Sequence, residues 1–217
     1  MIHSRPFLFL ALIAAGVAQD KSAAPEPQVF NFQTLTAGPV PEEGFTATDQ
    51  EAKFVIGVEG ESKYLELLPQ PLVDGGMLAG KSVQGPCTVT AKIKATGKRR
   101  SQPRFGIGVH GMNGPRLRMV AARKQLELII PRDSEEPVAT ADYAGWESGK
   151  WAWLELSVAT VEGGSLIEGR MWAEGGTRPD KPVITFKTMT PPGQGKASVW
   201  GTPYSELPIQ FDDITVK

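Results

Sequence analysis

The chain has very little cysteine: its 217 residues include only Cys87. One cysteine excludes an internal disulfide, so an apolar core must hold the fold together. A domain of about 200 residues can bury such a core without covalent links. Because Cys87 opens a Thr-Val-Thr stretch, we expect it to be a small buried hydrophobic residue and not a reactive thiol.

Apolar runs long enough to cross a membrane are also missing. The longest, residues 7–17, is shorter than the roughly 20 residues that a membrane-spanning helix needs. It follows a short basic head with His3 and Arg5, a pattern typical of a secretory signal. We therefore expect a signal peptide over 1–18, a secreted or periplasmic protein without a membrane span, and a flexible linker over 19–28, which is rich in Ala, Pro and charge.

Neither sign of charge predominates, since 23 Lys and Arg stand against 24 Asp and Glu for a formal net charge of −1. Nucleic-acid-binding domains carry a basic patch or tail. The one basic run, 98–100, lies between Gly97 and Ser101 and is predicted to be a hairpin tip. The charge balance therefore argues against nucleic acid as a partner.

Common hydrolase motifs are missing too. The chain has no Gly-x-Ser-x-Gly motif and no His/Cys cluster with metal spacing, and His110 is the one histidine after the predicted signal. The alternating acids Glu-x-Asp-x-Glu, which jelly-roll glycosidases commonly carry on one strand, do not occur. The sequence favours a noncatalytic protein, and the enzymatic alternative would use Glu155 or Glu168.

What the chain has is alternation of apolar and other residues with period two. The segments that alternate are 87–93, 105–109, 117–119, 126–130, 154–158 and 167–171. Turns rich in Gly, Pro and Asn separate them, and no stretch keeps a helical period for three turns. These features predict an all-β fold, a single antiparallel β-sandwich or jelly-roll domain over 29–217. The glycine-rich stretch 72–85 is predicted to be its longest loop.

The closing segment carries two adjacent carboxylates, Asp212 and Asp213. The alternation of Ile209 and Phe211 slips by one residue there before Ile214, which predicts a β-bulge. With backbone carbonyls, the two carboxylates are a candidate structural Ca²⁺ site. The alternative is a solvated or capping pair. We expect no other cofactor.

The next candidate residues point away from the predicted core on two consecutive strands. On the first strand these are Arg104, Gly106, Gly108 and His110, and on the second they are Arg116 and Arg118. Glycine inside a strand often marks a place where another group approaches the backbone. This glycine trench, flanked by His110 and arginines, is predicted to accept a polar ligand.

Further candidates lie on the strands before and after the turn at 162–164. If Val158 pairs with Ile167, counting places Glu155 opposite Arg170 and Trp153 opposite Trp172. Tryptophan rings stack on the C–H faces of sugars, and charged groups bind their hydroxyls. A structural cross-strand pair is the alternative. The predicted ligand-binding residues are His110, Arg116, Arg118, Trp153, Glu155, Arg170 and Trp172.

With these motifs, the chain after the predicted signal resembles concanavalin A-like jelly-roll domains of the LamG or laminarinase type, which occur in secreted bacterial proteins. The segments that carry the resemblance are Phe-Asn-Phe and Gly-Pro-Val-Pro-Glu-Glu-Gly-Phe within 30–45, Arg-Phe-Gly-Ile-Gly-Val-His-Gly at 104–111, Gly-Lys-Trp-Ala-Trp-Leu-Glu-Leu at 149–156, Gly-Arg-Met-Trp at 169–172 and Phe-Asp-Asp-Ile-Thr-Val at 211–216. The resemblance implies two curved antiparallel sheets with a concave face that often binds carbohydrate, and in some members a Ca²⁺ near the terminal strand.

We therefore expect an exported, noncatalytic, lectin-like module that binds carbohydrate on a concave sheet face. Related domains include 3-keto-disaccharide hydrolases, so a glycoside-processing enzyme is one alternative. The other is a purely structural domain that packs on a protein of the cell envelope.

Overall fold

The computed structural model describes residues 26–131 and 136–217. The predicted signal peptide and residues 19–25 of the predicted linker lie outside the described residues. Strand β1 begins at Gln28, the last residue of that predicted linker. Of the described residues, none belongs to a helix long and apolar enough to cross a membrane.

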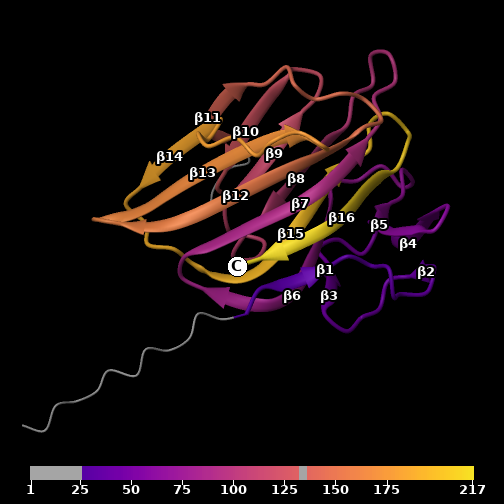
Figure 1. The fold of residues 1–217 in the computed structure, drawn as a ribbon, viewed down its shortest axis with the longest axis horizontal. Coiled ribbons are helices and arrows are strands. Elements are labelled where there is room, and N and C mark those ends of the chain that lie inside the picture. The colour runs from indigo at the N-terminus through magenta and orange to yellow at the C-terminus, as the bar shows by residue number, and fades with distance from the viewer. Residues whose placement is uncertain (1–25, 132–135) are drawn as a thin grey trace, which may run out of the picture.

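The described residues form sixteen strands, arranged as two stacked antiparallel sheets (Figure 1). The predicted all-β, single-domain sandwich is therefore confirmed. The strands are β1 Gln28–Phe30, β2 Gly38–Pro39, β3 Phe45–Ala47, β4 Phe54–Glu59, β5 Ser62–Leu67, β6 Gly75–Gln84, β7 Cys87–Ala95, β8 Arg104–Gly108, β9 Arg116–Val120, β10 Gln125–Ile129, β11 Pro137–Asp142, β12 Trp151–Val161, β13 Gly164–Ala173, β14 Ile184–Thr188, β15 Gln194–Thr202 and β16 Ile209–Val216.

We call the two layers sheet A and sheet B. Sheet A has nine strands in the order β14-β13-β12-β7-β16-β5-β4-β2, with β1 paired to β16. Sheet B has seven strands in the order β11-β10-β9-β8-β15-β6-β3. The terminal strands β1 and β16 thus lie side by side in sheet A (Figure 1).

The core lies between the two sheets because each strand turns one apolar face inward. Burial alternates along the whole of β7, where Cys87, Val89, Ala91, Ile93 and Ala95 are buried. Burial raises the pKa of the Cys87 thiol to about 11, so the thiol stays protonated at neutral pH. The prediction of a small buried hydrophobic residue at Cys87 is confirmed.

The prediction of a long loop over 72–85 is wrong, because most of this stretch forms β6, an inner strand of sheet B between β15 and β3. Two of its glycines are needed because neighbouring side chains pack directly against the backbone of β6. A Cβ at Gly75 would lie 2.8 Å from the Cβ of Ala52, and one at Gly76 would lie 2.6 Å from the Trp200 ring. Glycine content alone does not distinguish such a strand from a loop.

The predicted bulge in the closing strand is confirmed. The register between β16 and β7 shifts between Asp212 and Thr215, and Asp213 has a φ of 49°. The extra residue restores the inward orientation of Ile214 and Val216, which are both buried.

Candidate functional site

The predicted ligand-binding residues do not share one face. Trp153, Glu155, Arg170 and Trp172 lie on the outer face of sheet A, whereas Arg116 and Arg118 lie on the outer face of sheet B. The prediction of one concave face lined by all of them is therefore wrong. Alternation shows which residues of a strand share a face, but it does not show which sheet a hairpin joins.

On sheet A the predicted register is confirmed. Val158 pairs with Ile167, Glu155 with Arg170, and Trp153 with Trp172. The two indole rings are stacked, with their centroids 6.1 Å apart and their planes 13° from parallel. Both side chains are half-buried, so these rings form a partly exposed aromatic pair.

Next to that pair, Glu155 is held by two arginines. Arg170 Nη1 donates to Glu155 Oε1 at 3.2 Å. Arg178 Nε donates to Glu155 Oε2 at 2.6 Å, and Arg178 Nη2 donates to the other oxygen. The side chains of Glu155 and Arg170 are each only 8% exposed. Both carboxylate oxygens are thus occupied, and this geometry gives no support to Glu155 as an acid or base.

The same network fastens the connection between β13 and β14. Arg170 Nη2 donates to the Asp180 carbonyl and to Glu168 Oε2, both at 3.2 Å. Arg178 and Asp180 belong to residues 174–183, which join the two strands. The charged groups predicted to face a ligand therefore bind this connection instead, which accounts for their burial on an outer face.

A lysine offsets the negative charge around the Asp212–Asp213 pair. Lys92 Nζ lies 3.3 Å from Asp213 Oδ2 and 3.2 Å from Glu174 Oε1, and Asp212 Oδ1 accepts the Asp213 N–H at 2.9 Å. Within residues 26–131 and 136–217, no three or more His, Cys, Asp or Glu side chains are grouped to hold a metal. The Lys92 ammonium thus places a positive charge beside Asp213 and Glu174, and the Ca²⁺ site at Asp212 and Asp213 stays a prediction.

We expect Asp212→Asn to stabilise the protein at pH 7 by about 1–3 kcal/mol. Burial, followed by repulsion from Asp213, raises the pKa of Asp212 to about 6, whereas an unfolded Asp ionises near pH 3.9. The folded state binds more protons between these values, so stability falls as pH rises from about 4 to about 6. The asparagine removes this loss and retains an acceptor for the Asp213 N–H.

Urea unfolding at pH 4, 5, 6 and 7 measures the effect. In Asp212→Asn the fall in unfolding free energy over this range should be smaller than in the parent chain. The matched control, Asp213→Asn, should keep most of that fall, because burial raises the pKa of Asp212 more than repulsion from Asp213 does. It should change stability by within about 1 kcal/mol, since the ion pair of Asp213 with Lys92 is partly exposed. Equal pH slopes in Asp212→Asn and the parent chain would contradict the assignment.

On sheet B the predicted glycine trench is filled by Trp200. This residue pairs with Gly76 of β6 and with Gly106 of β8. A Cβ at Gly108 would lie 2.5 Å from Ser198 Oγ and 3.2 Å from Trp200 Nε1, and one at Gly76 would meet the ring itself. A Cβ at Gly106 would meet the backbone carbonyl oxygen of Leu117. The groups that approach the glycine backbone are thus this indole, the Ser198 hydroxyl and the neighbouring strand β9, and not a ligand, which corrects the prediction.

The outward side of Trp200 is covered by Arg116, whose Cζ lies 3.4 Å from the centroid of the indole ring. Trp200 Nε1 donates to Ser198 Oγ at 2.8 Å, and the residue is only 8% exposed. Arg116 therefore forms the outer layer of a guanidinium–indole stack.

Next along the face, Glu127 is almost fully buried, with 1% of the residue exposed. Arg118 donates to Glu127 Oε2 from Nε at 3.1 Å and from Nη2 at 2.8 Å. Arg123 Nη1 donates to Oε1 at 3.2 Å. Two arginines thus fix one buried carboxylate on the outer face of a sheet, an arrangement that needs both partners to be stable.

A hollow of about 500 Å³ opens over this ion-paired group. We call it the arginine hollow, and its lining residues are Asp74, Arg104, Arg118, Arg123, Glu127, Glu136 and Pro137. Asp74 Oδ1 accepts the Thr202 hydroxyl at 2.7 Å. Arg104 Cζ lies 5.3 Å from the ring centroid of Tyr204, which is 41% exposed. The hollow therefore combines fixed charged groups with a nearby exposed aromatic ring.

Sequence reasoning found Arg118 but missed Asp74, Glu127 and Tyr204. A signal was present for Glu127, which interrupts the apolar run around Leu126 and Leu128 and lies opposite Arg118 in the pairing of β9 with β10. Asp74 and Tyr204 come from connections far away in the sequence, and only the folded chain brings them together.

His110 does not lie on the outer face with the arginines, which corrects the prediction. With a φ of 60° it turns out of the strand direction after β8, and it is 7% exposed. Its Nε2 lies 2.9 Å from the Gly85 carbonyl, so Nε2 carries the proton and donates. Burial lowers the pKa of His110, which keeps the ring neutral at pH 7.

Comparison with known proteins shows the fold. No protein-family model matches the chain, and no curated protein matches its sequence. The structure is similar to the carbohydrate binding module CBM66 from Bacillus subtilis, with 13% identity over 80% of this chain and 95% of that one, at a TM-score of 0.57. It is also similar to lectin II from Ulex europaeus, with 9% identity over 88% and 97%, at a TM-score of 0.59.

A third similar structure is a protein of unknown function with a galectin-like fold from Bacillus subtilis, with 12% identity over 84% of this chain and 94% of that one, at a TM-score of 0.56. Together these likenesses show that the chain has the concanavalin A-like lectin fold. At such low identities they establish the fold and not the ligand.

Proposed function

We propose that this chain is an exported, noncatalytic, lectin-like module that binds a neutral carbohydrate in the arginine hollow. The observation that carries the proposal is the pair of guanidinium groups that Glu127 fixes, together with the exposed carboxylate of Asp74 in the same hollow. Sugar hydroxyls both donate and accept, so a carboxylate next to a guanidinium can bind two neighbouring hydroxyls at once.

Charge balance in the arginine hollow favours a neutral ligand. Among the described residues that line it are three arginines and three acidic residues, so neither sign predominates there. Because Arg118 and Glu127 are already held by each other, little ordering remains to be lost when a ligand binds. The exposed ring of Tyr204 beside Arg104 offers an apolar surface for the C–H face of a sugar.

Three further elements belong to the proposal. The lectins and the carbohydrate binding module among the similar structures support carbohydrate as the ligand class. The signal-like residues 1–18 support export. Kinship with the LamG or laminarinase type within the fold class is also proposed here, on the sequence motifs alone.

A glycan array probed with the purified chain tests the proposal, followed by titration of the strongest hit. We expect Tyr204→Ala to weaken binding by about ten-fold through lost stacking. Arg104→Ala should weaken it by about five-fold through lost hydrogen bonds. Arg100→Ala, in the hairpin at 97–101 outside the hollow, is the matched control and should leave binding unchanged.

Two outcomes would contradict the proposed site. If folded protein binds no glycan, the structural or protein-interaction role in the cell envelope takes its place. If binding is lost in Trp153→Ala and kept in Tyr204→Ala, the ligand lies on the aromatic pair of sheet A. A glycan that is turned over would instead favour the enzymatic alternative.

A further inference from the structure

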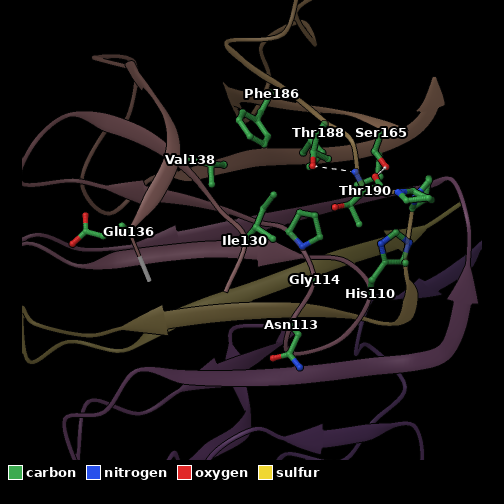
Figure 2. A pocket seen from close by; sticks show the side chains of 16 residues that line it. His110, Asn113, Gly114, Ile130, Glu136, Val138, Ser165, Phe186, Thr188 and Thr190 are labelled. Atoms are coloured by element: carbon green, nitrogen blue, oxygen red, sulfur yellow. Dashed lines mark hydrogen bonds between the residues drawn. The ribbon is translucent and has the colours of Figure 1, made fainter. Parts of the chain in front are cut away.

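A second cavity lies at the sandwich edge where β11 of sheet B and β14 of sheet A run side by side (Figure 1). We call it the edge pocket; its volume is about 340 Å³. This is near the lower end of the roughly 300–1,000 Å³ range of small-molecule sites. Figure 2 shows it lined by residues of both sheets and of the connections between them.

One part of the edge pocket is apolar. Ile130 and Val138 contribute from the sheet B side, and Ile167 and Phe186 contribute from the sheet A side. In Figure 2 the side chains of Ile130, Val138 and Phe186 lie near one another. Val138 is exposed, so a ligand that covers it would remove apolar surface from water.

Polar groups gather at the other side, where Figure 2 shows His110, Ser165, Thr188 and Thr190. The hydroxyls of Ser165 and Thr188 already bond to the Thr190 backbone: Ser165 Oγ donates to its carbonyl at 2.6 Å, and Thr188 Oγ1 accepts its N–H at 3.2 Å. These bonds fix the wall of the pocket. Of the described residues that line the pocket, His110 is the one with a buried side-chain atom that has no hydrogen-bond partner.

The His110 ring has one satisfied and one unsatisfied nitrogen. Nε2 donates to the Gly85 carbonyl, so Nδ1 of the neutral ring is an acceptor. Nδ1 is buried and has no hydrogen-bond partner among the described residues, although the residue is only 7% exposed. Gly193 packs beside the ring, where a Cβ would be 3.7 Å from Nδ1.

Charge narrows the ligand class further. Glu136 lines the edge pocket, and the described residues that line the pocket include no lysine or arginine. A carboxylate or phosphate anion would thus be buried without a cation from the described lining, and an ionised carboxylate has no proton to donate to His110 Nδ1. We propose that the edge pocket binds a small neutral molecule with an apolar body and one hydroxyl, an alcohol or a phenol, whose hydroxyl donates to His110 Nδ1. This proposal does not depend on carbohydrate binding in the arginine hollow.

Three matched probes test the proposal by titration of the full chain, namely 1-naphthol, 1-methoxynaphthalene and 1-naphthoate. We expect 1-naphthol to bind about five- to ten-fold more tightly than 1-methoxynaphthalene, which has no donor. The anionic 1-naphthoate should bind at least about ten-fold more weakly than 1-naphthol. Equal affinities for the three probes, or no binding of 1-naphthol, would overturn the proposal.

Two variants locate the site. Val138→Trp should fill the edge pocket and weaken 1-naphthol binding by about ten-fold or more. Val58→Trp is the matched control, since Val58 is also an exposed strand valine but lies in β4, outside the pocket lining. Unchanged binding in Val138→Trp, or equal losses in both variants, would overturn the assignment.

NMR spectroscopy tests the role of His110 separately. The ¹⁵N chemical shift of His110 Nδ1 should move when 1-naphthol binds and should not move with 1-methoxynaphthalene. His110→Phe keeps an aromatic ring, and if it folds it should bind the two probes equally. An Nδ1 shift that does not respond to 1-naphthol would exclude this nitrogen as the acceptor.

Discussion

Glu155→Ala should lower the free energy of unfolding by about 3–5 kcal/mol. The substitution leaves Arg170, whose side chain is 8% exposed, buried without its main carboxylate partner. It also releases Arg178, which holds residues 174–183 over the outer face of sheet A through two bonds to Glu155. Denaturant unfolding measures the loss, and hydrogen exchange should show weaker protection in 174–183.

Glu168→Ala is the control for that experiment. Glu168 bonds to the same arginine at 3.2 Å, but its side chain is 27% exposed, so its removal should cost about 1 kcal/mol or less. A loss in Glu155→Ala no larger than the loss in Glu168→Ala would show that the buried network does not hold this connection. Glycan binding in the arginine hollow should persist in both variants while they are folded, because these residues lie on the other sheet.

Trp200→Ala should also cost about 3–5 kcal/mol. The indole lies over the glycines of β6 and β8 and under the Arg116 guanidinium, and Gly76 and Gly108 carry no side chains that could fill the space. Arg116 would lose its aromatic partner as well. Urea unfolding, followed by circular dichroism, measures the change without relying on tryptophan fluorescence.

Trp153→Ala provides the matched comparison on sheet A. Trp153 is half-buried and stacks on Trp172, and cross-strand aromatic pairs contribute about 0.2–1 kcal/mol. We therefore expect a loss several-fold smaller than for Trp200→Ala. Equal losses would mean that Trp200 does not fill the glycine trench in the manner described.

Several features of this protein were predictable because they depend on neighbours along the chain. The short turn at 162–164 fixes the register of β12 and β13, so counting alone placed Trp153 opposite Trp172. The slip in alternation at Asp212 likewise located the bulge. Alternation with turns at regular spacing was enough to predict the β-sandwich.

The candidate site was harder to predict because its parts come from distant segments. Arg118 was identified, but its partner across the face, Glu127, and the nearby Asp74 and Tyr204 were not. The glycines of β6 suggested a loop, since nothing in the local sequence shows that Trp200, more than 120 residues away, would lie on them.

The sequence by itself determined the strands in which apolar residues alternate, the faces that these strands turn inward, and the pairing across short turns. Side-chain direction alternates with period two and a tight turn permits few registers, so these features need only local information. The tertiary structure alone decided that β12 and β13 join sheet A while β8 and β9 join sheet B. That choice depends on pairing with β7 and β15 and on core packing between distant residues, which no local pattern encodes.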